Sequence, residues 1–305
     1  MDIATIFAVG SELEEHINSF TIRTVGIATL LLIVLMVLAR LVVNNKQREH
    51  FKKPLFILIA LTIGLPSLLM TGSTIYVNTI SDSGGPVHWH TDIEFWVCGQ
   101  EVELRDPVGA LSNKIGTSTY HEHDDKRIHL EGVVIDTEVD ASLRKFLHVT
   151  GGEISTDKLV IPTEQSVFED DVDGDRVSGA PDSVMQFLTT DQNNRSILSM
   201  QNGLGCSPQN RAEIQVFLIR FDEASKTYTQ TKLADPGAYV MRDESVVPPG
   251  DCVIVEYDVP KNRTTKLCQQ YGVRDATRCV EFGVSTYNPE LCNIREATET
   301  TGGTE

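Results

Sequence analysis

Two long apolar runs near the start of the chain predict a pair of membrane-spanning helices. Residues 25–43 are apolar apart from Arg40 near the end, and a second, largely apolar run covers residues 54–77. Each run has about 20 residues, which as a helix is long enough to cross the hydrocarbon core of a bilayer. We therefore expect a transmembrane helical hairpin over residues 22–78. The alternative is a helical hairpin buried inside a soluble protein.

The charges beside these runs predict which side of the membrane each segment occupies. The connector, residues 44–53, is basic, whereas residues 1–20 contain acidic residues and neither Lys nor Arg. Basic loops are retained on the cytoplasmic side. We therefore expect an integral protein of the cell membrane with a cytoplasmic loop at 44–53, and with both termini and most of the chain on the extracytoplasmic side.

After a linker that contains Gly84 and Gly85, alternating polar and apolar residues predict β-strands. In residues 88–98 the even positions carry mostly polar, ligand-type side chains, and the odd positions carry mostly apolar ones. Residues 99–100 then predict a hairpin turn into a partner strand at 101–105. Residues 127–135 alternate in the same way, so that His129 and Glu131 share a face.

The remaining pattern predicts further strands and one or two short helices. We expect a helix over residues 141–148, capped by Asp140, with its Leu and Phe side chains buried. Further strands are expected at residues 159–161, 214–221, 239–241 and 252–257. The fold class is therefore a two-helix transmembrane hairpin followed by a mainly β region, either β-sandwich-like or a small mixed β fold.

These patterns also divide the chain into segments. They are an extracytoplasmic tail (1–21), the transmembrane hairpin (22–78), a His-rich β domain (79–152), a second β region (153–258), a Cys-rich appendage (259–292) and a disordered tail (293–305).

Charge and cysteine content narrow the classes of partner and chemistry. The formal net charge of −17 argues against nucleic acid, which requires a basic surface. All six cysteines follow the second apolar run: Cys98, Cys206, Cys252, Cys268, Cys279 and Cys292. An even number on the oxidising side of a membrane predicts disulfides, with the pairing left open. No CxxC spacing occurs, so neither a thiolate zinc site nor a redox motif is expected.

Histidines gather in one short stretch, which is the strongest pointer to function. Of the eight histidines, five lie close together: His88, His90, His121, His123 and His129. Two of the spacings are His-x-His, which on a strand directs both rings to one face about 7 Å apart. Imidazole suits zinc and copper, so we expect a Zn or Cu site at these histidines.

Nearby carboxylates can complete such a site. Glu94, Asp124 and Glu131 are candidates for a further ligand or for groups that orient an imidazole. The alternative is that the histidines are hydrogen-bonded to these acids and have a structural role in a partner-binding or adhesion ectodomain.

A resemblance accompanies this pattern. The segments His88-Trp-His90, Ile115-Gly116, His121-Glu-His123-Asp124 and Ile128-His129-Leu-Glu131 resemble those of a group of uncharacterised bacterial membrane-anchored or secreted proteins. The likeness covers about 60 residues and implies no particular activity. This chain has Glu122 and Lys126 where that group often has Thr and Gly.

Whether the chain is an enzyme stays open at the level of sequence. His88-x-His90 followed by Glu94 is similar to the first cupin motif, but the second cupin motif is missing. The order of the histidines also differs from that of copper–zinc superoxide dismutases. A metal-dependent envelope enzyme is therefore an alternative to a metal-binding module, with no catalytic residue and no protein partner identified.

An acidic segment further along predicts a second type of metal site. Asp171, Asp173, Asp175 and Asp182 occupy positions 1, 3, 5 and 12 of a loop, which is the ligand order of calcium loops. Position 6 is Arg176 instead of the usual Gly. We expect either a calcium loop or an acidic solvated turn.

Overall fold

The computed structural model describes residues 9–43, 46–107, 113–164, 182–207, 210–222, 227–246 and 250–269. They belong to two compact units. The helical unit comprises residues 1–86 with 133–136, and the β unit comprises residues 87–132 with 137–305.

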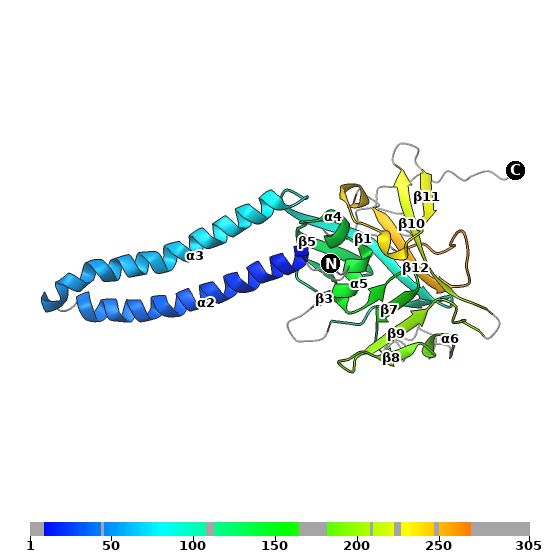
Figure 1. The fold of residues 1–305 in the computed structure, drawn as a ribbon, viewed down its shortest axis with the longest axis horizontal. Coiled ribbons are helices and arrows are strands. Elements are labelled where there is room, and N and C mark those ends of the chain that lie inside the picture. Colours follow the sequence, from blue (N-terminus) through cyan, green and yellow to red (C-terminus); the bar gives the residue numbers. More distant parts are fainter. Residues whose placement is uncertain are drawn as a thin grey trace, which may run out of the picture. The chain divides into compact units, whose positions relative to one another are not determined.

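The helical unit contains two long helices that lie side by side (Figure 1). They are α2 (Val9–Val43) and α3 (Lys52–Ile80), joined by the 3-10 helix η1 (Lys46–Phe51). The stretches Ser19–Val42 and Glu49–Ile80 are long and apolar enough to cross a membrane, and almost none of their side chains are buried in the protein. The predicted helical hairpin is confirmed, and its insertion into a membrane stays a prediction.

Polar side chains within these helices bond to their own helix. The hydroxyls of Thr29, Thr62 and Ser67 each donate to the carbonyl oxygen four residues earlier, at 2.8 Å. Such bonds leave few polar groups that would need water. These three hydroxyls therefore need no water, whereas the charged Arg40 interrupts the apolar run near the end of α2.

The β unit contains one sheet of eight strands. They are β1 (Pro86–Val97), β2 (Gln100–Val102), β3 (Ile115–Gly116), β4 (Tyr120–Glu122), β5 (Arg127–Val133), β10 (Glu213–Asp222), β11 (Thr227–Lys232) and β12 (Asp251–Asp258). Their order is β11-β10-β12-β1-β5-β4-β3, and β2 pairs with β1.

At the centre of this sheet, the first strand of the β unit pairs with its last described strand. Strand β1 pairs in parallel with β12, with Asp92 opposite Cys252 and Val97 opposite Tyr257. The large sheet therefore draws strands from both of the sequence ranges that we expected to be separate, 79–152 and 153–258. The parallel pair β1–β12 beside the antiparallel pair β10–β12 makes the sheet mixed.

The hairpin after β1 is confirmed, but its turn is at residues 98–99 instead of 99–100, and its partner strand is β2 instead of the longer strand expected at 101–105. Val97 pairs with Gln100, and the two residues between them have positive φ, 53° at Cys98 and 81° at Gly99. Positive φ at both central positions is typical of a type I′ turn.

The second sheet has four strands in the order β6-β7-β9-β8. They are β6 (Glu153–Ile154), β7 (Lys158–Pro162), β8 (Leu188–Thr190) and β9 (Ser196–Gln201), with helix α6 (Asp182–Met185) before β8. The 3-10 helices η3 (Pro236–Ala238) and η4 (Asp243–Val246) lie between β11 and β12. The strand expected at 239–241 is wrong, because Val240 forms only an isolated bridge to Ser142.

Two short helices follow β5. They are α4 (Thr137–Asp140) and α5 (Leu143–Thr150). The expected burial of Leu143, Phe146 and Leu147 is confirmed, but the expected cap is wrong. Ser142, rather than Asp140, caps α5: its hydroxyl accepts from the amide of Lys145 at 3.1 Å, while Asp140 ends α4.

The two faces of the large sheet carry different side chains. On one face β1 contributes Ile93, Phe95 and Val97, and β5 contributes Ile128 and Leu130, all of them buried. On the opposite face the alternate positions of β1 and β5 are mostly polar and include the histidines. Alternation with a period of two produces this separation.

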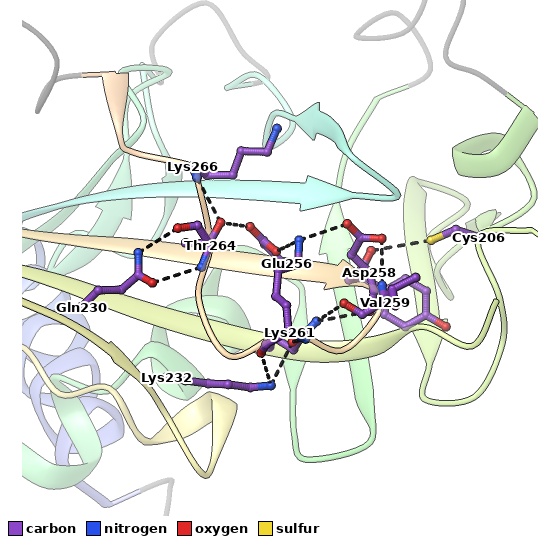
Figure 2. Close-up of polar contacts among 11 residues, drawn as sticks. Cys206, Gln230, Lys232, Glu256, Asp258, Val259, Lys261, Thr264 and Lys266 are labelled. Carbon is purple, nitrogen blue, oxygen red and sulfur yellow. Dashed lines mark hydrogen bonds and ion pairs between the residues drawn. The ribbon is translucent and has the colours of Figure 1, made fainter. Parts of the chain in front are cut away.

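The chain that follows β12 folds back across the sheet and contacts side chains of β11, β12 and β1 (Figure 2). Lys261 Nζ lies 2.6 Å from Glu256 Oε2 and 3.1 Å from Asp258 Oδ2. The amide of Thr264 donates to Gln230 Oε1 at 3.0 Å, and its hydroxyl donates to Glu256. We call residues 259–269 the strap.

Two disulfides tie distant parts of the β unit together. One joins Cys98 to Cys206, and the other joins Cys252 of β12 to Cys268 of the strap. Cys252 and Cys268 are buried in an apolar cluster that includes Phe217. The expected disulfides are therefore present among the described residues, while Cys279 and Cys292 lie outside them, as does the predicted tail at 293–305.

Candidate metal centre

Three neighbouring strands bring histidines to one face of the large sheet. His90 is on β1, His129 on β5 and His121 on β4, and these strands are adjacent in the order β1-β5-β4. His121 and His129 are directly opposite each other in the register of β4 and β5. The cluster therefore arises from the strand order, because each strand alone supplies only one or two rings.

Packing on the other face fixes the direction of His121. The preceding residue, Tyr120, packs against Phe146 of α5, with ring centroids 5.5 Å apart. The Tyr120 hydroxyl donates to the carbonyl of Ala141 at 3.2 Å. Successive side chains of a strand point to opposite faces. The His121 ring must therefore point to the opposite face from α5. On that face the His121 side chain is fully buried.

Four of the candidate ligands form a first group, which we call group A. Group A consists of His88, His90, His129 and Glu131, and their ligand atoms all lie within 4.8 Å of one another. His88 Nε2 lies 3.0 Å from Glu131 Oε1. Two ligands of one tetrahedral zinc ion are about 3.3 Å apart, so this spacing suits a shared ion.

Three histidines form a second group, group B, which shares one member with the first. Group B consists of His121, His123 and His129, again with ligand atoms within 4.8 Å of one another. The Nε2 atoms of His121 and His123 are 3.0 Å apart, and His123 Nδ1 lies 2.9 Å from the carbonyl oxygen of Asn113. A carbonyl bound to Nδ1 fixes the tautomer that leaves Nε2 free to bind a metal.

Asp125 holds the histidine that the two groups share. Its Oδ2 lies 2.9 Å from His129 Nε2, and its Oδ1 accepts from the amide of Arg127 at 3.1 Å. Burial alone would raise the pKa of the Asp125 carboxyl, but the hydrogen bond and charge of His129 lower it overall. From the sequence, Asp124 was the candidate for a carboxylate that orients an imidazole. The structure shows that Asp125, in the turn after β4, contacts His129 instead.

Burial keeps two of the imidazoles neutral. Desolvation is the main cause that lowers the pKa of His90 to about 3, with additional repulsion from His129 and His88. Desolvation also lowers the pKa of His121 to about 3, followed by the charges of Lys114 and His123. Neutral imidazole is the form that binds metal ions, so His90 and His121 are in the metal-binding form at neutral pH.

Two buried nitrogens of the cluster are left without a hydrogen bond. His90 Nε2 and His121 Nδ1 are inaccessible to solvent and have no partner among the described residues. An unsatisfied polar atom in such a position is costly unless an ion or a water molecule satisfies it. A transition metal meets this requirement, and the nitrogen-rich donor set suits zinc or copper.

A buried ion pair lies next to the histidines on the same face. Arg127 Nε donates to Asp92 Oδ1 at 2.7 Å, and both side chains are almost fully buried. Asp92 follows His90 on the face of β1, and Arg127 precedes His129 on β5. The pair therefore links the two central strands of the cluster.

The other candidate residues lie elsewhere. Glu94 accepts from Trp96 Nε1 at 3.0 Å and from the amide of Gln269 in the strap, and it belongs to neither histidine group. Asp124, with a φ of 65°, lies in the turn before β5 and is also in neither group. Of the calcium loop only Asp182 is described, as the first residue of α6. Asp171, Asp173 and Asp175 lie outside the described residues, so the calcium site stays a prediction.

Gly116 makes room for the close approach of β3 to β4. It pairs with His121 and has a φ of 106°, and a Cβ here would collide with the carbonyl oxygen of Tyr120. Gly116→Ala is therefore expected to lower the free energy of unfolding by about 1–3 kcal/mol. Denaturation followed by tryptophan fluorescence measures this loss. Gly99→Ala is the control, because Gly99 also has positive φ but open space around it. Equal losses in the two variants would contradict the role of close approach.

Comparisons with known proteins add no further constraint. Searches of protein-family models, curated proteins and solved structures gave no significant match. The resemblance drawn from the His-x-His pattern therefore stays a prediction.

Proposed function

We propose that this chain is a membrane-anchored protein that binds zinc or copper at the histidine cluster on the extracytoplasmic side. The observation that carries the proposal is the convergence of five imidazoles and Glu131, from three adjacent strands and the residue after β4, at ligand spacing. Surface histidines without a ligand would be expected to spread apart and to remain hydrated. Here the ring nitrogen of His90 is buried without a partner.

The donor set supports a borderline transition metal. All but one of the ligand candidates are imidazole nitrogens, and the remaining one is a carboxylate. Calcium and magnesium prefer oxygen ligands, whereas zinc and copper accept imidazole readily. The net charge of −17 also favours the accumulation of cations near the protein.

Several features support the anchoring and the side of the membrane. Two helices are long and apolar enough to span a bilayer, and the connector between them is basic. The β unit contains two disulfides, which persist in oxidising surroundings outside the cytoplasm. These observations together favour an extracytoplasmic β unit that is held at the membrane by the hairpin.

Metal analysis of the full chain in detergent tests the proposal. After dialysis, the wild-type protein is expected to retain zinc or copper, measured by elemental analysis. Free zinc at 100 times its Kd is expected to stabilise the fold by about 2.7 kcal/mol, which raises the melting temperature by roughly 5–10 °C. The variant H90A/H121A/H129A, which removes one ring from each strand, should lose both effects.

The control for this experiment is His148→Ala. His148 lies exposed on α5 and belongs to neither histidine group, so its variant should bind and respond as the wild type does. A wild-type protein that holds no transition metal and whose melting temperature does not respond to zinc or copper would refute the proposal.

A further inference from the structure

We propose that the histidine cluster binds two metal ions that share the Glu131 carboxylate, rather than a single ion. This inference rests on the proposed function and extends it. The candidate ligands divide into groups A and B, each of which is compact within 4.8 Å. Among the described residues, no group of that compactness contains the ligand atoms of both His88 and His123, so one ion at the present spacing cannot take all the donors.

The position of Glu131 supports two ions. Its Oε1 lies 3.0 Å from His88 Nε2 in group A, and its Oε2 lies 4.0 Å from His121 Nε2 in group B. Each oxygen of one carboxylate therefore faces a different group. In two-metal sites the ions are about 3.5–4 Å apart, a distance that the two oxygens of a carboxylate can span.

The arrangement of the rings agrees with two adjacent ion positions. His129 is stacked parallel to His121, with centroids 5.5 Å apart, and is edge-on to His90 and His123 at 4.5 and 4.7 Å. It thus stands between the paired rings of β1 and the paired rings around β4. Asp125 occupies its Nε2, so its Nδ1 is the nitrogen that can serve an ion.

Each ion would then have a sufficient set of ligands. His88, His90 and Glu131 supply one ion, while His121, His123 and Glu131 supply the other, and His129 adds a ligand to one of them. Three or four protein ligands per ion is the usual number for zinc. His88 and Glu131 have side chains that are 51% and 40% exposed, so the first ion would be open to small solutes.

Metal stoichiometry of the full chain in detergent tests this inference. With ZnCl2 or CuCl2 the wild type is expected to bind two ions per chain, and the variants H88A/H90A and H121A/H123A one ion each. His148→Ala is the matched control and should bind two. Binding of a single ion by the wild type, lost in both double variants, would overturn the two-ion site and leave the proposed function standing. No ion in the wild type would overturn the proposed function itself.

A second measurement does not depend on variants that must fold. Two copper(II) ions about 4 Å apart couple their electron spins, which weakens the ordinary paramagnetic resonance signal and adds a half-field transition. The fully loaded wild type is expected to show this coupled spectrum. An uncoupled signal that integrates to all of the bound copper would contradict a shared carboxylate.

Discussion

Replacing both Cys98 and Cys206 by serine is expected to lower the free energy of unfolding of the β unit by about 4.7 kcal/mol. This disulfide spans 108 residues, so its loss releases a very long loop in the unfolded chain. Unfolding can be followed in the full chain, because the two tryptophans, Trp89 and Trp96, both lie in β1. Their fluorescence reports on the β unit and not on the helical hairpin.

The second disulfide supplies the matched control. Cys252 and Cys268 are only 16 residues apart, so C252S/C268S is expected to cost about 3 kcal/mol. Cys252 and Cys268 are buried in an apolar cluster, so their serine hydroxyls add a desolvation cost that the half-buried Cys98 and Cys206 lack. Repeating both double substitutions with alanine removes that cost and isolates loop length. In the alanine variants, a larger loss from the short loop than from the long one would contradict the entropic account of the Cys98–Cys206 bond.

Replacing Asp92 by alanine is expected to destabilise the β unit by about 3–5 kcal/mol. The substitution removes a carboxylate 2.7 Å from Arg127 Nε and leaves the guanidinium buried without that counterion. Because the pair joins β1 to β5, the same variant is expected to bind metal more weakly. Denaturation followed by tryptophan fluorescence measures the first effect, and zinc titration measures the second.

Asp92→Asn is the control for this substitution. The amide oxygen can still accept a hydrogen bond from Arg127, so the loss of stability should be smaller than in Asp92→Ala. If Asp92→Ala cost less than about 1 kcal/mol, the pair would contribute no more than an exposed ion pair, and the prediction would be wrong.

The histidine site was only partly readable from the sequence. A period of two places His88 with His90 and His129 with Glu131, and the structure agrees for each strand. Periodicity could not predict that Asp125 is the hydrogen-bond partner of His129. Asp125 lies in a turn, between residues of positive φ at 124 and 126, where the direction of a side chain depends on backbone angles that no periodicity specifies.

Glu94 shows more clearly that sequence periodicity cannot predict contacts between distant parts of the chain. Its place on the histidine face made it a candidate ligand, but its carboxylate accepts from the amide of Gln269, which is 175 residues away in sequence. The parallel pairing of β1 with β12 has the same origin, because it brings residue 92 beside residue 252. Contacts at such separations follow from packing of the whole sheet and leave no local pattern.

Features that depend on neighbouring residues could be predicted from the sequence. These are the two apolar helices, the alternation that separates the faces of β1 and β5, and the presence of a hairpin after β1, although its turn lies one residue earlier than expected. Tertiary structure alone decided the order β1-β5-β4, and with it the division of the histidines into two groups that share His129. The physical reason is that helix and strand periodicity are local steric properties, whereas the neighbour of a strand is chosen by burial of its apolar face within the whole β unit.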